Sequence, residues 1–252
     1  MRRDVIYLHK SFRSLRLGPG RLAFAFGIAA AGSALLAACG TLLLEIHGQV
    51  CRFLLELARI PSSRMARLEF FPGFGPASVP VTTVLQYEPN PVKATILFVV
   101  GVLVLLAIHR RIALAQNFVV FLVTLLVTAA GVIAFNPSFR FNSTEFTQMW
   151  LRGEVLVWLL LPWVSAFLFV LIQPSLIGRV AWVLVAQIFG FLWSAVRLAF
   201  CLGVLHYTGI LFLPLLWFCL GLLADLLYMF VFYSLAVYQT CGAWGRRESW
   251  RY

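Results

Sequence analysis

Four ionisable residues lie within long apolar stretches of the sequence: Glu154, Arg197, His206 and Asp225. An unpaired charge at the centre of a bilayer costs at least about 2.5–3.5 kcal/mol, so such residues indicate a partner or a function. Arg197 is suited to binding an anionic group, and Glu154 or His206 to moving protons. The alternatives are a structural ion pair between Glu154 and Arg197, and an interfacial position for His206.

The depths of these residues in the membrane indicate which of them meet. Glu154 lies about five residues from the outer end of its helix and Arg197 about eight, which at about 1.5 Å per residue is a difference of a few ångströms. The two side chains are therefore expected to pair, with His206 just above them. Asp225 lies deeper and is expected to need another partner.

Cys201 is one helical turn beyond Arg197, where a neighbouring guanidinium favours the thiolate form of a nucleophile. His206 follows five residues later, about 140° around the helix, so it must fold back to act as a base. The alternative is that Cys201 packs as a small hydrophobic residue.

The predicted helix 179–205 is expected to present Arg197 and Cys201 inward, because small and polar residues recur along it at steps of three and four. Such residues allow close helix contact and interhelical hydrogen bonds, so this face is expected to be buried. The inward face comprises Gln187, Gly190, Ser194, Arg197 and Cys201. The opposite face carries Trp182, Phe189, Leu192 and Val196.

The composition of the 252-residue chain is that of a membrane protein. Hydrophobic residues make up 62% and charged residues 12%, against roughly 45–50% and about 25% in soluble domains. The net charge of +11 lies mostly in clusters at the ends of apolar stretches, which favours membrane anchoring over nucleic-acid binding. Membrane lipids are therefore expected partners, and nucleic acid is not.

The sequence predicts an all-α integral membrane protein with about six transmembrane helices, each needing roughly 20 apolar residues. Basic clusters at the N-terminus (1–21), at Arg110 and Arg111, at Arg179 and at the C-terminus predict that both ends are cytoplasmic. Basic residues in the 59–93 region weaken this bias, so the number of early spans stays open. The predicted spans are 22–44, 94–109, 117–136, 149–173, 179–205 and 209–238.

Residues 45–92 are predicted to lie outside the membrane. Polar residues from Glu45 to Arg59 recur at helical spacing opposite an apolar face, which predicts an amphipathic helix that is bent away from the first span or continues it. Arg52 and Glu56 are spaced to pair on it. An extracytoplasmic loop or β-hairpin follows, with strands at 66–71 and 79–87 around a Pro-Gly breaker at 72–76.

Residues 140–238 resemble the exosortase and archaeosortase family of membrane transpeptidases. The segment Ser194-Ala195-Val196-Arg197-Leu198 resembles the family's arginine segment, and Arg197 is the one position carried across. Where the family's catalytic cysteine would fall, residues 148–154 contain none. The resemblance therefore implies a companion protein or a member without transpeptidase activity.

These observations give the expected organisation and function. The chain is taken as a single membrane domain, 1–252, with a helical bundle at 93–238; residues 36–39 resemble a lipoprotein cleavage box, but a continuous first helix is expected there. The expected function is cell-envelope assembly or protein sorting in a bacterial-type inner membrane, with envelope-assembly or sorting proteins as partners. A transporter subunit and a non-catalytic assembly subunit are the alternatives. Whether the chain is an enzyme stays open, and no nucleotide, zinc or haem motif indicates a cofactor.

Overall fold

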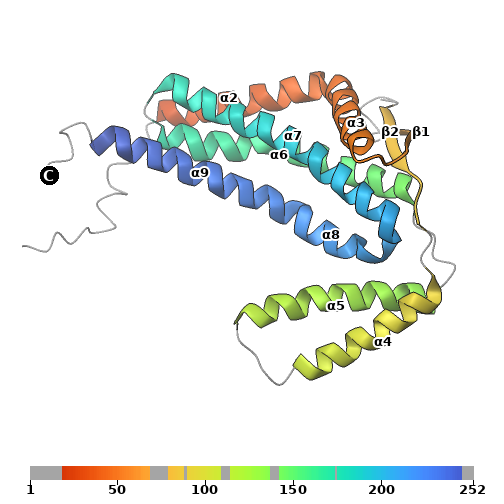
Figure 1. The fold of residues 1–252 in the computed structure, drawn as a ribbon. Coiled ribbons are helices and arrows are strands. Elements are labelled where there is room, and N and C mark those ends of the chain that lie inside the picture. Colours follow the sequence, from red (N-terminus) through yellow and green to blue (C-terminus); the bar gives the residue numbers. More distant parts are fainter. Residues whose placement is uncertain are drawn as a thin grey trace, which may run out of the picture. The chain divides into compact units, whose positions relative to one another are not determined.

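The computed structural model describes residues 19–68, 79–87, 90–108, 114–136, 142–173 and 175–245. Nearly all of these residues are helical (Figure 1). The helices are α2 (Pro19–Ala38), α3 (Gly40–Leu57), α4 (Pro91–Ile108), α5 (Leu114–Phe135), α6 (Ser143–Ile172), α7 (Leu176–Thr208), the short 3₁₀ helix η1 (Gly209–Phe212), α8 (Leu213–Leu220) and α9 (Leu222–Gly245). The strands are β1 (Ser62–Leu68) and β2 (Val79–Val84).

Several of these helices are long and apolar enough to cross a membrane, as predicted. Among the described residues four stretches meet that test, and Val92–Leu106 is a shorter apolar helix. The four are Pro19–Ala38, Asn117–Phe135, Ser143–Ile172 and Leu176–Thr240, the last of which contains α7, η1, α8 and most of α9.

The chain forms two compact units. The first comprises residues 1–39, 156–190 and 227–252. Aromatic side chains pack its helices together: Phe26 of α2 meets Phe167 of α6 with ring centroids 5.1 Å apart, and Trp182 of α7 meets Phe232 of α9 at 6.1 Å. A part-buried hydrogen bond reinforces this packing, in which Ser33 Oγ donates to Leu159 O at 2.8 Å.

The second unit comprises residues 40–155 and 191–226 and contains the hairpin. The β1–β2 pair is antiparallel, with Ser62 opposite Val84 and an irregularity between Arg64 and Ala66. Threonine and serine side chains attach the hairpin to its neighbours: Thr147 Oγ1 of α6 donates to Thr82 O at 3.0 Å, and Ser143 Oγ donates to Val84 O at 2.8 Å. The predicted hairpin is therefore present, and its first strand begins earlier than expected.

Two predicted spans are interrupted. The first, 22–44, ends as α2 at Ala38, and α3 begins at Gly40 as a separate amphipathic helix. The last, 209–238, is divided into η1, α8 and α9, because Gly221 adopts φ −79° and ψ −130° and stops α8. A side chain at Gly221 would collide with the carbonyl oxygen of Trp217, so this break depends on glycine.

Arg52 Nε and Glu56 Oε1 lie 3.3 Å apart on α3, which confirms their predicted pairing. Several orientation residues lie outside the described part of the chain, as do the breaker at 72–76 and residues 1–18 of the basic N-terminal segment. Arg110, Arg111, Arg246, Arg247 and Arg251 are among them. The predicted orientation, the domain division and the number of six spans therefore stay predictions.

The α4–α5 pair generates a test of close helix packing. A side chain at Gly101 of α4 would collide with Val127 of α5, whereas no atom lies within 4 Å of the corresponding position at Gly27. Gly101→Leu is expected to destabilise the folded protein by about 1–3 kcal/mol, the usual cost of overpacking. Unfolding in mixed detergent micelles measures this change, with Gly27→Leu as the matched control. Equal stability of the two variants would contradict the packing.

Candidate site around Arg197

Arg197 of α7 lies at the centre of a buried polar cluster, with 1% of its surface exposed. Its Nη2 donates to Glu154 Oε1 at 2.9 Å and to Asp225 Oδ1 at 2.6 Å. Its Nη1 donates to the backbone carbonyls of Leu220 and Gly221, at 2.5 and 2.8 Å. One guanidinium therefore joins α6, α7 and the junction of α8 with α9.

The backbone carbonyls are available to Arg197 because the helix is broken there. The last carbonyls of a helix have no partner within it, and in an apolar environment each needs a donor from elsewhere. Arg197 supplies donors at the end of α8, where a cation also interacts favourably with the helix dipole. Gly209, with φ 69°, turns the chain after α7 so that the break reaches Arg197.

Asp225 lies in the first turn of α9, the position at which the dipole of a helix favours a carboxylate. The expectation that Asp225 needs a partner other than Arg197 is wrong. It assumed one continuous helix over 209–238, and the interruption at Gly221 changes where the carboxylate lies. Arg197 thus meets two carboxylates, both buried.

Glu154 pairs with Arg197, as the sequence predicts. Trp150, one turn earlier on α6, places its ring 5.7 Å from the Arg197 guanidinium carbon, within range of a cation–π interaction. Its ring centroid is also 5.4 Å from that of Trp217 on α8. Within the described part of the chain, Glu154 Oε2 and Arg197 Nε have no hydrogen-bond partner.

His47 of α3 is a buried residue that sequence reasoning missed. Its Nε2 lies 3.1 Å from Ser194 Oγ, and Ser194 is itself buried one turn before Arg197 and near the Glu154 carboxylate. Leu44, Cys51 and Leu55 share the buried face of α3 with His47, so its spacing from them was the available signal. Burial lowers the pKa of His47 to about 4, and the charge of Arg197 acts in the same direction.

Cys201 is fully buried, and Cys51 of α3 lies near it. Burial, with a smaller contribution from Cys201, raises the pKa of Cys51 to about 12, so this thiol stays protonated at neutral pH. Among the described residues, the hydrogen-bond partners of Arg197 include no cysteine. This surrounding matches the alternative in which Cys201 packs as a small hydrophobic residue.

His206 lies at the end of α7, where its Nδ1–H donates to Leu85 O at 2.6 Å and its ring contacts Tyr207. It is nine residues from Arg197, about 13 Å along a helix. The structure therefore connects His206 with the hairpin and not with the Arg197 cluster. The catalytic roles of Arg197, Glu154, His206 and Cys201 stay predictions.

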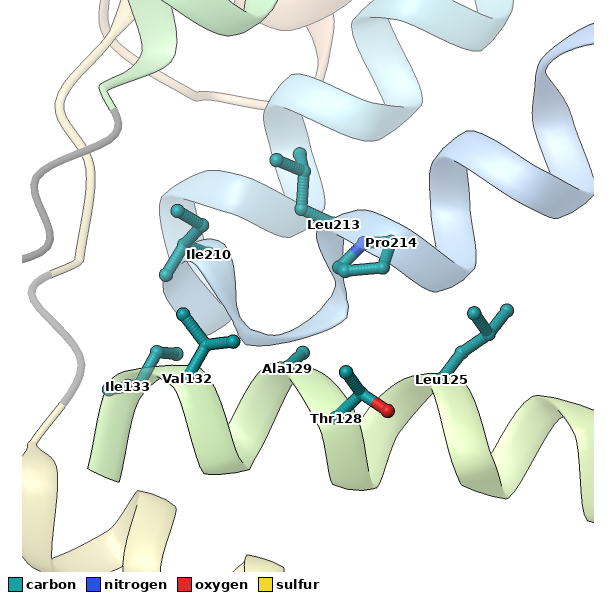
Figure 2. Close-up of a pocket in the computed structure, with 8 residues that line it drawn as sticks. All are labelled: Leu125, Thr128, Ala129, Val132, Ile133, Ile210, Leu213 and Pro214. Atoms are coloured by element: carbon teal, nitrogen blue, oxygen red, sulfur yellow. The ribbon is translucent and has the colours of Figure 1, made fainter. Parts of the chain in front are cut away.

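Two surface grooves lie near these helices, and both are apolar. Figure 2 shows the first, of about 280 Å³, between α5 and the η1–α8 segment; Thr128 is its one hydroxyl-bearing side chain. That hydroxyl donates to Thr124 O in its own helix. The second, of about 500 Å³, lies between the C-terminal end of α3 and α7. None of the residues lining either groove belongs to the Arg197 cluster.

No groups of histidine, cysteine and carboxylate side chains suited to a metal ion occur among the described residues. No family model matches the chain, and no curated protein or solved structure is significantly similar to it.

The Arg197 cluster predicts that loss of the guanidinium destabilises the protein strongly and that removal of the paired charges restores the stability. Arg197→Met leaves two buried carboxyl groups and a helix end without their donor, and is expected to destabilise the protein by about 3–5 kcal/mol. The triple variant Arg197→Met, Glu154→Gln, Asp225→Asn removes the charges together and is expected to recover most of that loss.

Detergent unfolding measures both variants, with Arg152→Met on the exposed side of α6 as the matched control. A triple variant no more stable than Arg197→Met would contradict the role of charge balance.

His47 predicts a dependence of stability on pH. Because its folded-state pKa of about 4 lies below the ordinary value of 6.5, the unfolded chain binds a proton first as the pH falls. The stability linked to neutral His47 is present above pH 6.5 and is lost between pH 6.5 and 4, by about 3 kcal/mol in total. Unfolding measured across this range should show a weaker acid dependence in His47→Gln than in the wild type. An equal pH dependence of the free energy of unfolding in the two proteins would exclude His47 as the titrating group.

Proposed function

We propose that this chain is a multi-pass protein of a bacterial-type inner membrane that serves cell-envelope assembly or protein sorting. It is exosortase-like in architecture and acts as a non-catalytic companion, not as a transpeptidase. In this proposal both termini are cytoplasmic, and six spans are formed by α2, α4, α5, α6, α7 and the α8–α9 segment. Other envelope-assembly or sorting proteins are its partners.

The observation that carries this proposal is the pairing of Glu154 with Arg197. Arg197 is the position that resembles the family's arginine, and Glu154 belongs to the segment in which the family's cysteine would fall. A carboxylate from that segment occupies the guanidinium, so the thiol chemistry of a transpeptidase has no nucleophile at this point. The cluster instead joins three helical segments, which suits a structural role.

The surface of the second unit supports a docking role. The second strand of the hairpin is attached to α6 through Ser143 and Thr147, and the residue after it to α7 through His206. Next to it, α3 presents the exposed Arg52–Glu56 pair. A partner protein can therefore meet a preformed surface of helix and hairpin.

A transporter subunit is the second candidate, and the charge of the cluster favours it. Two carboxyl groups face one guanidinium, so the cluster can accept one proton and become electrically balanced. Proton-coupled flux in proteoliposomes that is lost in Asp225→Asn would support this candidate. Both grooves are apolar, and none of the residues lining them belongs to the cluster.

The thiol of Cys201 provides the decisive test of a non-catalytic role. In the native host, deletion of the gene is expected to alter the set of exported or surface-anchored proteins, measured by quantitative mass spectrometry. Cys201→Ala is expected to restore the wild-type set in full, because the buried thiol acts only by packing.

The triple variant at Arg197, Glu154 and Asp225 is expected to restore it as well, provided that the variant is inserted at the wild-type level. A folded Cys201→Ala variant without activity would contradict the proposal and indicate catalysis.

A further inference from the structure

The second groove, between α3 and α7, has the chemistry of a lipid site. Its volume is about 500 Å³. Its walls include Leu55, Ala58 and Ile60 on one side and Phe200, Gly203 and Tyr207 on the other. Ile60 and Gly203 approach closely, since a side-chain carbon built at Gly203 would lie 3.2 Å from Ile60 Cδ1. A partner helix about 10 Å across would fill this volume with roughly one turn, whereas a flexible acyl chain can follow it.

The outer surface of α3 indicates that the groove opens toward lipid at a membrane boundary. Its exposed apolar residues, Leu42, Ile46, Phe53 and Leu57, fall within about 60° of one another on the helix. Charged and polar residues follow on the adjacent side: Glu45, Gln49, Arg52 and Glu56. A helix with neighbouring apolar and charged stripes lies in the interface, with one stripe against acyl chains and the other against headgroups and water.

A basic residue lies between two residues of the groove wall in the sequence. Arg59 is exposed and lies between Ala58 and Ile60, which both line the groove. Its φ is 58°, a left-handed conformation that favours glycine. The helix end is closed by Ile60 N donating to Leu55 O and Arg59 N donating to Glu56 O, each at 2.9 Å. Glycine would adopt this backbone conformation with less strain. The presence of an arginine here is therefore explained by its charged side chain and not by the turn.

Among the described residues Arg59 takes part in no salt bridge, and the nearby Glu56 pairs with Arg52. Arg side chains bind phosphate through paired hydrogen bonds, and an apolar groove beside such a cation matches the two parts of a phospholipid. We infer that the groove between α3 and α7 binds one anionic phospholipid, with an acyl chain along the groove and the phosphate at Arg59. This site is separate from the Arg197 cluster and does not depend on the proposed function.

The probe is phosphatidylglycerol carrying a photoreactive group on one acyl chain, reconstituted with the full-length protein in nanodiscs. Phosphatidylcholine with the same acyl chain is the zwitterionic comparison. After illumination, mass spectrometry is expected to find the label concentrated in residues 54–60 and 196–208, and more strongly with phosphatidylglycerol.

Arg59→Gln is expected to lower labelling by phosphatidylglycerol about fivefold, the effect of one interfacial charge, and to leave labelling by phosphatidylcholine unchanged. Gly203→Leu is expected to block the groove and to lower labelling by both lipids. Arg152→Gln removes an exposed charge from α6 and is expected to change neither.

Arg59 is exposed, so its variant tests the site even if Gly203→Leu fails to fold. Equal labelling of wild type and Arg59→Gln by phosphatidylglycerol would overturn the inference. Labelling distributed evenly over the apolar helices, with no concentration at the groove, would overturn it as well.

Discussion

The second unit depends on a single guanidinium. Arg197 meets two carboxylates and two backbone carbonyls, and these four acceptors come from three segments of the chain. In an apolar environment neither a charge nor the carbonyl of an interrupted helix is stable without a partner. The guanidinium, the carboxylates and the free carbonyls thus stabilise one another. The helix break at Gly221 and the charge of Arg197 therefore depend on each other.

This dependence explains the character of the residues around the cluster. Trp150 covers the guanidinium with an aromatic face, and Ser194 joins the cluster to the buried ring of His47. The cluster therefore extends from α9 through α7 to α3. Other residues of the same unit line the two apolar grooves, and the charges of the cluster contact one another within the chain.

Local patterns in the sequence were sufficient for the class of fold. Hydropathy gave the positions of the apolar helices, and three- and four-residue spacing gave the buried face of α7, the amphipathic α3 and the Arg52–Glu56 pair. Turn residues gave the hairpin. Each of these signals depends on neighbours in sequence, for which spacing and geometry are closely linked.

The partners of Arg197 were predictable only in part. Glu154 followed from its similar depth, but Asp225 was misplaced because glycine within an apolar run gives no clear signal of a break. His47 was overlooked because a histidine on an amphipathic helix is equally suited to water. Its burial depends on the tertiary contact with Ser194, across 147 residues of sequence.

The positions of the partners of Arg197 also bear on biosynthesis. Glu154 precedes Arg197 by 43 residues, and Asp225 follows it by 28. As the chain leaves the ribosome, a counter-charge for the arginine already exists when α7 is presented to the membrane, so the positive charge need not enter lipid alone. The α8–α9 segment follows later. Its helix break supplies two backbone carbonyls and Asp225, which complete the neutralisation of Arg197 that Glu154 of α6 began.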